Sequence, residues 1–269
     1  MRRNELRITG IEGVVDGGLA TYSTPTGRRY FQHKLFCFHD GVATAAGTVV
    51  DRVRVKVDEV AIWDCTAQRL LDEAKLNGIT VGTGELPLNF SDPAAADKDD
   101  ESLTAWDTAG ARTMSVELQL KTAGAVPRIE GIMSFDRGFR VGVDGKRIRA
   151  IIRKSESTIN APSGLYDWDT ANKRFPILRF LMDGPQTINS VDVIADSERV
   201  WEVTKTQNAR VLADYGLDAT AFEYPLCFNF TEQIGDFLEV NQTLNVRIDS
   251  AAAQSITVLQ TSVSPGFGA

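Results

Sequence analysis

Few side chains in this sequence could carry out catalysis. The chain has two histidines, His33 and His39, and three cysteines, Cys37, Cys65 and Cys227. Histidines six residues apart face the same side of a β-strand, so His33 and His39 could together bind a metal ion. A catalytic site of this kind needs further His and Glu ligands downstream, and the chain has no third histidine. We therefore interpret both histidines as surface or rim side chains, and we predict no catalytic residue.

The cysteines are an odd number and include no C-x-x-C pair, which argues against a disulfide framework and against a zinc site. Cys37 lies in LFCFH and Cys227 in LCFNF, both of which are apolar segments typical of strands. These contexts favour buried structural thiols over nucleophiles. Reduced thiols also fit a protein that matures in a cytosol.

Carboxylates gather in the stretch SDPAAADKDDES, residues 91–102. Asp97, Asp99 and Asp100 are close enough in sequence for their oxygens to bind Ca²⁺. The stretch lacks the glycine-containing twelve-residue pattern of a calcium loop, so we predict a solvated surface loop. A structural Ca²⁺ site is the alternative, and we predict no other cofactor.

Positive charge is concentrated at residues 137–154, which hold seven Lys and Arg side chains against one acidic side chain, Asp144. The simplest interpretation is the solvated faces of a hairpin with a tight turn at Asp144. In a second interpretation, Arg147, Arg149 and Arg153 contact anionic lipid or another protein, because polybasic segments gain about 1 kcal/mol per charge near an anionic membrane. The net charge of the whole chain is −7, which argues against a sequence-specific nucleic-acid-binding protein.

The elements that must position these side chains occur twice. When the sequence is compared with itself at an offset of 138, 10 of the 38 residues in 53–90 are identical to their partners in 191–228. Random pairing at ordinary composition gives roughly two or three identities. Further matches flank them in the same order: FHDG with LMDG, VELQL with LNVRI, and IEGIM with ITVLQ. The sequence therefore predicts two copies of one large unit.

The repeat also predicts equivalent packing residues, because its best-preserved part is the hexamer pair ELPLNF and EYPLCF. A proline has no backbone N–H, so it is expected at the start or the edge of a strand. A buried tryptophan contributes up to about 5 kcal/mol when it removes ~200 Å² from water. The predicted structural residues are Trp63, Pro87, Leu88, Phe90, Trp201, Pro225, Leu226 and Phe228.

Each unit has the pattern of many short strands and one short helix. VVDRVRVKV alternates between apolar and polar residues, as a half-buried strand does, whereas TAQRLLDEAKLNG has helical spacing between Thr66 and Gly78. MSVELQL and RIEGIMSF are predicted to form a hairpin. We predict an all-β fold with a few short helices, arranged as two sandwiches or barrels in domains 1–138 and 139–269. Neither a signal peptide nor a membrane span of ~18 apolar residues is expected.

Two equal β-sandwiches in a chain of this length resemble the double jelly-roll major capsid proteins of icosahedral viruses, including the adenovirus hexon and the coats of membrane-containing bacteriophages. The resemblance is nearest to corticovirus coats. It is carried by INSVDVIADSERVWEVTKTQNARVLADYG and LNVRIDSAAAQSITVLQTSV, and by the first-half counterparts VDRVRVKVDEVAIWDCTAQRLLDEAK and MSVELQLKTAGAVPRIEGIMSF. Residues 1–30 and 137–174 match poorly.

The resemblance implies a double jelly roll, two β-sandwiches side by side, in a structural protein that is not an enzyme. It implies homotrimers of six sandwiches that tile an icosahedral virion shell over an internal membrane, after assembly in the host cytoplasm. Implied partners are neighbouring capsomers, penton and minor capsid or membrane proteins, and the viral membrane. Arg147, Arg149 and Arg153 are the candidates for contact with the membrane or with a minor protein.

Two other functions are compatible with paired sandwiches. The first is an enzyme on two jelly rolls, such as a double cupin or an amidase. The second is a carbohydrate-binding protein, for which Trp106, Tyr166 and Trp168, in loop-like segments, are the aromatic candidates.

Overall fold

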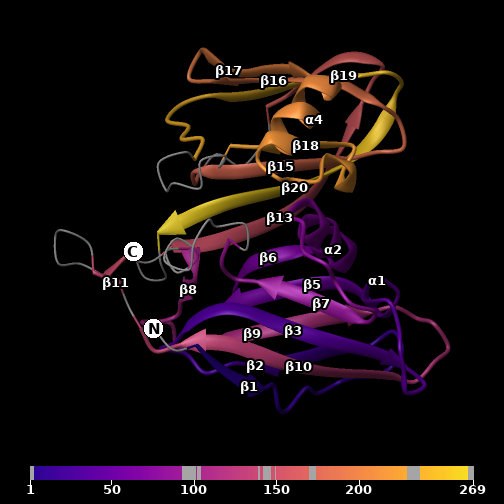
Figure 1. The fold of residues 1–269 in the computed structure, drawn as a ribbon, viewed down its shortest axis with the longest axis vertical. Helices are drawn as coiled ribbons and strands as arrows, with labels where there is room; N and C mark the ends of the chain where they lie inside the picture. Colours follow the sequence, from indigo (N-terminus) through magenta and orange to yellow (C-terminus); the bar gives the residue numbers. More distant parts are fainter. Residues whose placement is uncertain are drawn as a thin grey trace. The chain divides into compact units, whose positions relative to one another are not determined.

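The chain folds into two compact units (Figure 1). The computed structural model describes residues 3–92, 101, 104–138, 140, 141, 147, 148, 150–169, 174–228 and 237–265. Unit 1 comprises Met1–Ala74, Thr80–Lys154 and Ser264–Ala269, and unit 2 comprises Lys75–Ile79 and Ser155–Val263.

Unit 1 is built from two antiparallel sheets. In the first sheet the order is β1-β10-β3, and β4, β7 and β8 pair with the other edge of β3. In the second the order is β2-β9-β5-β6, with residues 150–154 of β13 beyond β6. The strands are β1 (Asn4–Arg7), β2 (Leu19–Ser23), β3 (Arg29–His39), β4 (Val42–Ala43), β5 (Val50–Val57), β6 (Val60–Thr66), β7 (Glu85–Asn89), β8 (Trp106–Asp107), β9 (Met114–Leu120) and β10 (Pro127–Asp136), followed by β11 (Arg140–Val141), β12 (Arg147–Ile148) and β13 (Ala150–Ala161).

Unit 2 is also built from two antiparallel sheets, of order β13-β20-β15-β18 and β14-β19-β16-β17. Residues 155–161 of β13 belong to this unit. The remaining strands are β14 (Gly164–Trp168), β15 (Ile177–Asp183), β16 (Ile188–Ala195), β17 (Glu198–Thr204), β18 (Tyr224–Cys227), β19 (Leu244–Ser250) and β20 (Gln254–Pro265).

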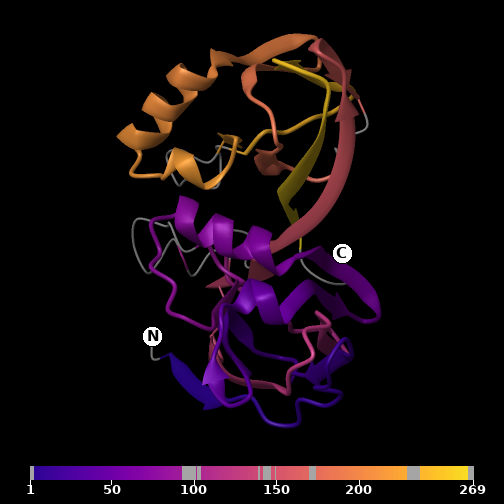
Figure 2. The same cartoon turned by 90° about the vertical axis from the view of Figure 1, so that its right-hand side faces the viewer.

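One helix follows the equivalent strand in each unit. These helices are α2 (Ala67–Leu76), after β6, and α4 (Lys205–Asp214), after β17; the shorter helices are α1 (Ala46–Val49) and η1 (Ala219–Ala221). Thr204 caps α4, because its hydroxyl accepts from the backbone N–H of Gln207 while the Gln207 side chain accepts from the backbone N–H of Thr204. Figure 2 shows α4 along one side of the strands of unit 2.

The two units match strand for strand. The sheet β1-β10-β3-β7 corresponds to β13-β20-β15-β18, and β2-β9-β5-β6 corresponds to β14-β19-β16-β17. Eight strands in two four-stranded sheets are a jelly roll, so the predicted all-β double jelly roll with a few short helices is confirmed. The alternation that predicted the strands is also present, since β5 and β16 have the same burial pattern, in which the last five residues alternate between buried and half-buried.

One predicted pairing is wrong. β9 and β10 do not form a hairpin, because β9 pairs with β5 and β2 whereas β10 pairs with β3 and β1. The connection at residues 121–126 crosses from one sheet to the other. Asp16 accepts hydrogen bonds there from the backbone N–H groups of Ala123 and Gly124, and Asp40 accepts one from that of Val126. β9 and β10 each have one apolar face. These two faces are buried against one another when the strands lie in two sheets that pack face to face.

In the basic stretch, the two strands of the other predicted hairpin do pair with each other. β11 and β12 are antiparallel, with Arg140 opposite Ile148 and Val141 opposite Arg147. The turn predicted at Asp144 lies outside the described residues.

Candidate functional site

His33 is not a surface or rim side chain, which corrects the sequence-based interpretation. It is fully buried among aromatic rings, with centroid distances of 5.2 Å to Tyr30 and 4.7 Å to Phe90. Its Nδ1 lies 3.0 Å from the hydroxyl of Tyr22, and its Nε2 has no hydrogen-bond partner among the described residues. Burial lowers the pKa of His33 to about 3 and raises the pKa of Tyr22. His33 is therefore a neutral core residue. Its side chain points inward because buried and half-buried residues alternate along β3, and His33 is at one of the buried positions.

This burial predicts acid lability. The unfolded chain has a normal imidazole pKa, near 6.5, so between that pH and about 3 it binds a proton that the folded chain excludes. The contribution of His33 to the free energy of unfolding is therefore fully present above the pKa of the unfolded chain, and it is lost as the pH falls below that pKa. Between pH 7 and pH 5 this group alone should lower the free energy of unfolding by about 2 kcal/mol. Urea unfolding should show that His33→Gln removes this part of the pH dependence. His39→Gln, at the half-buried second histidine, is the control, and equal acid losses in the wild-type and His33→Gln proteins would contradict the prediction.

The cysteines are all buried, as predicted. Burial raises the pKa of Cys37 to about 12, so its thiolate is strongly disfavoured at neutral pH. These side chains act as small apolar groups in the strands that carry them.

The repeat-equivalent residues form the same pair in each unit, but with different burial. Trp63 is fully buried and stacks on Phe90, with ring centroids 4.9 Å apart and planes at 23°. Trp201 and Phe228 are only half-buried, and their centroids are 6.4 Å apart at 78°. Pro87, Leu88, Pro225 and Leu226 are buried. The asymmetry follows from β13, whose first residues lie beyond β6 and contribute the carbonyl of Ile152 to the Trp63 Nε1–H at 2.7 Å.

The other residues shared by the two hexamers have distinct local environments. Pro87 and Pro225 lie in β7 and β18, which among the described residues pair only with β3 and β15. Both prolines thus occupy edge strands, where a missing N–H is tolerated. Glu85 lies 3.6 Å from Lys34 Nζ, whereas Glu223 lies 2.5 Å from Lys205 Nζ and accepts from the backbone N–H of Ile188.

Two repeat-equivalent aspartates hold the loops at the strand ends. Asp58 accepts hydrogen bonds from the backbone N–H groups of Arg112 and Thr113, just before β9. Asp196 accepts from the backbone N–H groups of three consecutive residues, 241–243, just before β19, and these bonds lower its pKa to about 2. The identity of Asp58 and Asp196 thus has a structural cause that the sequence did not reveal.

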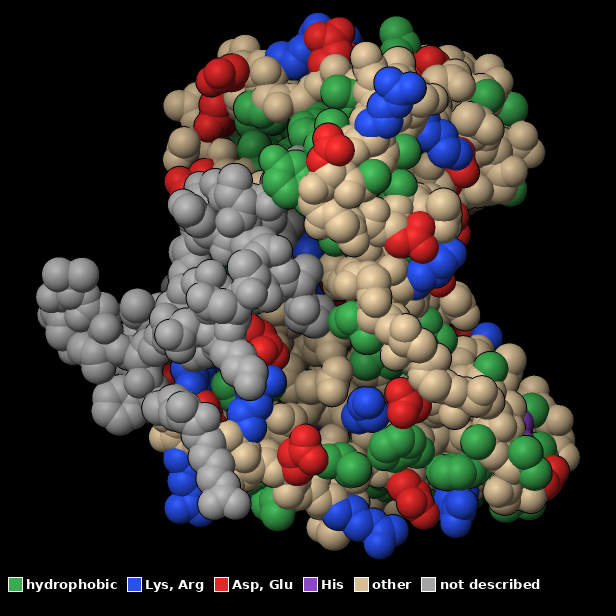
Figure 3. All heavy atoms as spheres, in the orientation of Figure 1, with side chains coloured by type: hydrophobic (Ala, Val, Ile, Leu, Met, Phe, Trp, Pro, Cys, Tyr) green, Lys and Arg blue, Asp and Glu red, His purple; other side chains and the backbone are tan. Residues whose placement is uncertain are grey.

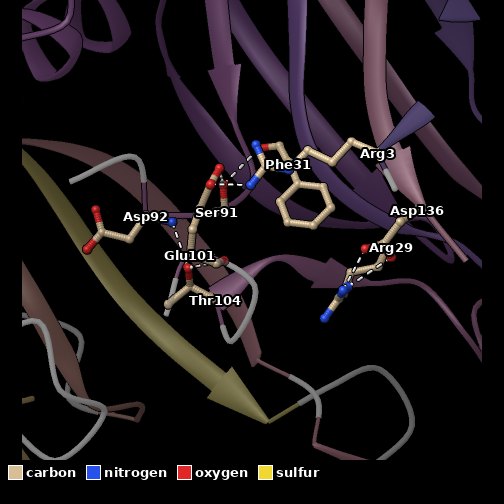
Figure 4. Close-up of polar contacts among 8 residues, drawn as sticks. All are labelled: Arg3, Arg29, Phe31, Ser91, Asp92, Glu101, Thr104 and Asp136. Atoms are coloured by element: carbon tan, nitrogen blue, oxygen red, sulfur yellow. Dashed lines mark hydrogen bonds and ion pairs between the residues drawn. The ribbon is translucent and has the colours of Figure 1, made fainter. Parts of the chain in front are cut away.

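The two ends of the acidic stretch are anchored to unit 1, as Figure 4 shows. Glu101 accepts a hydrogen bond from Ser91 and forms an ion pair with Arg3, whose guanidinium lies 4.1 Å from the centroid of Phe31. The backbone N–H of Asp92 donates to Thr104 Oγ1 at 2.7 Å. The candidate calcium ligands Asp97, Asp99 and Asp100 lie outside the described residues, and that site stays a prediction.

A second acidic side chain in the same view is buried. Asp136 and Arg29 are both almost fully buried, and two hydrogen bonds of 3.0 and 2.6 Å join them (Figure 4). This bidentate pair links the start of β3 to the end of β10.

The basic stretch is not uniformly solvated. Lys154 is buried, forms an ion pair with Glu73 of α2, and places Nζ 4.5 Å from the ring centroid of Trp63. Arg153 is half-buried, and its Nε donates to Ser264 at 3.0 Å. Arg147 lies in β12 and Arg149 outside the described residues, so their side-chain contacts are not defined.

The aromatic candidates for carbohydrate binding are not in exposed loops. Trp106 lies in β8 and is fully buried, and Trp168 lies in β14 and is 3% exposed. Tyr166 is half-buried and packs against the core of unit 2. A carbohydrate platform needs exposed rings, so the residues proposed for this alternative do not provide one.

The outer faces of the unit 1 sheets differ in character. On β5, the outward side chains of Arg52, Arg54 and Lys56 form ion pairs with Asp64 and Glu117. On the opposite sheet, an open depression of about 490 Å³ lies beside β1, lined by Glu5, Leu6, Arg7, Phe36, Glu130, Gly131 and Ile132. In Figure 3, hydrophobic side chains lie among charged ones on the part of unit 1 around β3 and β10.

No group of three or more His, Cys, Asp or Glu side chains in the described part of the chain is arranged to hold a metal ion. Within the same residues, no helix has the length and apolarity needed to cross a membrane.

Solved structures share this fold over nearly the whole chain. The major capsid protein P2 of bacteriophage PM2 has a TM-score of 0.82 and 18% identity, and the match covers 98% of each chain. A chain of Sulfolobus Turreted Icosahedral Virus has a TM-score of 0.70 and 8% identity, over 98% of this chain and 91% of that one. A chain of the PBCV-1 virus capsid has a TM-score of 0.65 and 7% identity, over 99% and 95%. At these identities the likeness shows the fold alone.

Family membership comes from the sequence. The viral coat protein P2 N-terminal domain matches residues 5–136, and the viral coat protein P2 C-terminal domain matches residues 151–266. No curated protein matches the chain. The two matches take in nearly all of the chain and confirm the resemblance to viral major capsid proteins. The chain therefore belongs to the viral coat protein P2 family, and it is a structural protein of the virion capsid rather than an enzyme.

Proposed function

We propose that three copies of the chain form a ring of six jelly rolls, and that these pseudo-hexagonal trimers tile an icosahedral shell over an internal membrane. The observation that carries this proposal is the strand-for-strand correspondence of the two units. A chain with two equivalent domains can fill a six-fold position with three copies, and closed cyclic symmetry is the normal way to build such a block. Neighbouring capsomers, penton proteins and minor capsid or membrane proteins would be its further partners.

The trimer can be tested in solution by size-exclusion chromatography with light scattering. The expected mass is three times 29.5 kDa, and it should persist on dilution because obligate interfaces of this kind bury more than ~2,000 Å². A monomer at high protein concentration would contradict the proposal.

Within this function, we propose that Arg147, Arg149 and Arg153 contact anionic lipid on the inner side of the shell. The support is the charge of residues 137–154, which hold seven Lys and Arg side chains against one acidic side chain. Replacing all three by glutamine should weaken co-sedimentation of the trimer with anionic liposomes by about 100-fold, at roughly 1 kcal/mol per charge.

A matched control removes three charges elsewhere. Lys34, Lys121 and Arg128 are exposed or half-buried in unit 1, and their replacement by glutamine lowers the net charge equally. Binding that is unchanged in the first variant, or equally reduced in both, would rule out a specific role for the basic segment.

A further inference from the structure

In each unit, one sheet ends at the strand that precedes the helix of that unit. Among the described residues, the outer edge of this last strand is covered by another strand in unit 1 but not in unit 2. In unit 1 that strand is β6, and residues 150–154 of β13 lie along its outer edge. In unit 2 the equivalent strand is β17, which among the described residues pairs only with β16. No residue of β17 is buried, and Val200 is 40% exposed.

The covering strand is the one that opens the next unit. β13 also pairs with β20, so it serves as the first strand of unit 2. β1 has the equivalent place in unit 1, because it opens that unit and pairs with β10. In the described part of the chain β1 pairs with no other strand, and all four of its residues are exposed.

We propose that β1 of one copy pairs with β17 of the next copy, as β13 pairs with β6 inside each chain. This inference rests on the proposed trimer and names the strands that close it. The intermolecular order β1-β17-β16 would then reproduce the order β13-β6-β5 that is observed within unit 1. The contact joins two different surfaces, so repeating it can close a ring of three copies, which a contact between two identical surfaces cannot do.

The side chains of the two strands suit such a contact. Leu6 in β1 is 48% exposed between Glu5 and Arg7, and Val200 in β17 lies between Arg199 and Trp201. Each edge thus has an apolar side chain beside charges, and Glu198 and Glu202 add acidic groups that can face Arg7. Charged residues also protect an open edge from indiscriminate pairing before assembly.

Cross-linking tests the geometry directly. A variant with both Leu6→Cys and Val200→Cys is treated with a short flexible bismaleimide, which does not depend on the strand register. The three native cysteines are buried and should not react. The double variant is expected to give covalent dimers and closed trimers on a denaturing gel, whereas each single variant should give none, because unlike edges meet.

The outcomes separate this inference from the trimer itself. A trimer by light scattering without cross-links in the double variant, or cross-links in a single variant, would overturn the β1–β17 contact and leave the trimer standing. A monomer would overturn both. Val200→Asp should also abolish the trimer peak, whereas Val126→Asp, at a loop valine that is 71% exposed, should retain it.

Discussion

Replacing Glu73 by alanine is expected to lower the free energy of unfolding by about 3–5 kcal/mol, because it leaves the ammonium of Lys154 buried without a counter-charge. Glu73 is 6% exposed and Lys154 is 3% exposed. Their ion pair joins the middle of α2 to the start of β13, and Trp63 lies under the ammonium group. Urea unfolding followed by tryptophan fluorescence would measure the loss.

Two comparisons separate the buried charge from lost helix packing. Asp51→Ala removes one partner of the exposed Lys121–Asp51 pair and should cost less than about 1 kcal/mol. The double variant Glu73→Ala, Lys154→Met removes both charges and should recover much of the stability that Glu73→Ala loses, because apolar replacements of a buried pair are often tolerated. A double variant as unstable as the single one would show that the charge pair is not the cause.

Replacing Trp63 by alanine is expected to destabilise unit 1 by about 3–5 kcal/mol, the usual cost of emptying a large buried aromatic site. The indole is fully buried between Phe90 and Trp106, at centroid distances of 4.9 and 5.5 Å. Its removal also leaves the carbonyl of Ile152 without the Nε1–H donor. Thermal unfolding monitored by circular dichroism should show a lower midpoint.

The repeat provides the matched control. Trp201→Ala alters the equivalent residue, but that ring is half-buried and should cost only about 1–2 kcal/mol. Trp63→Phe keeps most of the apolar volume and should fall between these values. Equal losses for Trp63→Ala and Trp201→Ala would mean that the strand beyond β6 does not add to the burial of Trp63.

The sequence alone determined the duplicated all-β plan. Val53, Val55 and Val57 recur as a period-two pattern that only a half-buried strand satisfies, and the 138-residue offset relates that strand to β16. The buried cysteines and the edge-strand prolines also followed from local chemistry. The coat function was predicted from the resemblance to known capsid proteins, because buried packing residues do not by themselves indicate a function.

Other features were beyond sequence patterns for identifiable reasons. The first two strands of each unit fall in the poorly matching segments 1–30 and 137–174, since β1 is exposed on both faces and shows no alternation. The false β9–β10 hairpin arose because adjacency in sequence does not reveal which sheet a strand joins.

Burial at Lys154, the last residue of the basic stretch, and at His33 was decided only by tertiary structure. Lys154 has the same side chain as the surface lysines, and it is buried because α2 brings Glu73 to it and Trp63 lies beneath its ammonium. His33 continues the inward face of β3 into an aromatic core. Residue type and spacing fix which strands form, whereas the energy of a charge depends on partners that are distant in sequence and meet only when the sheets have packed.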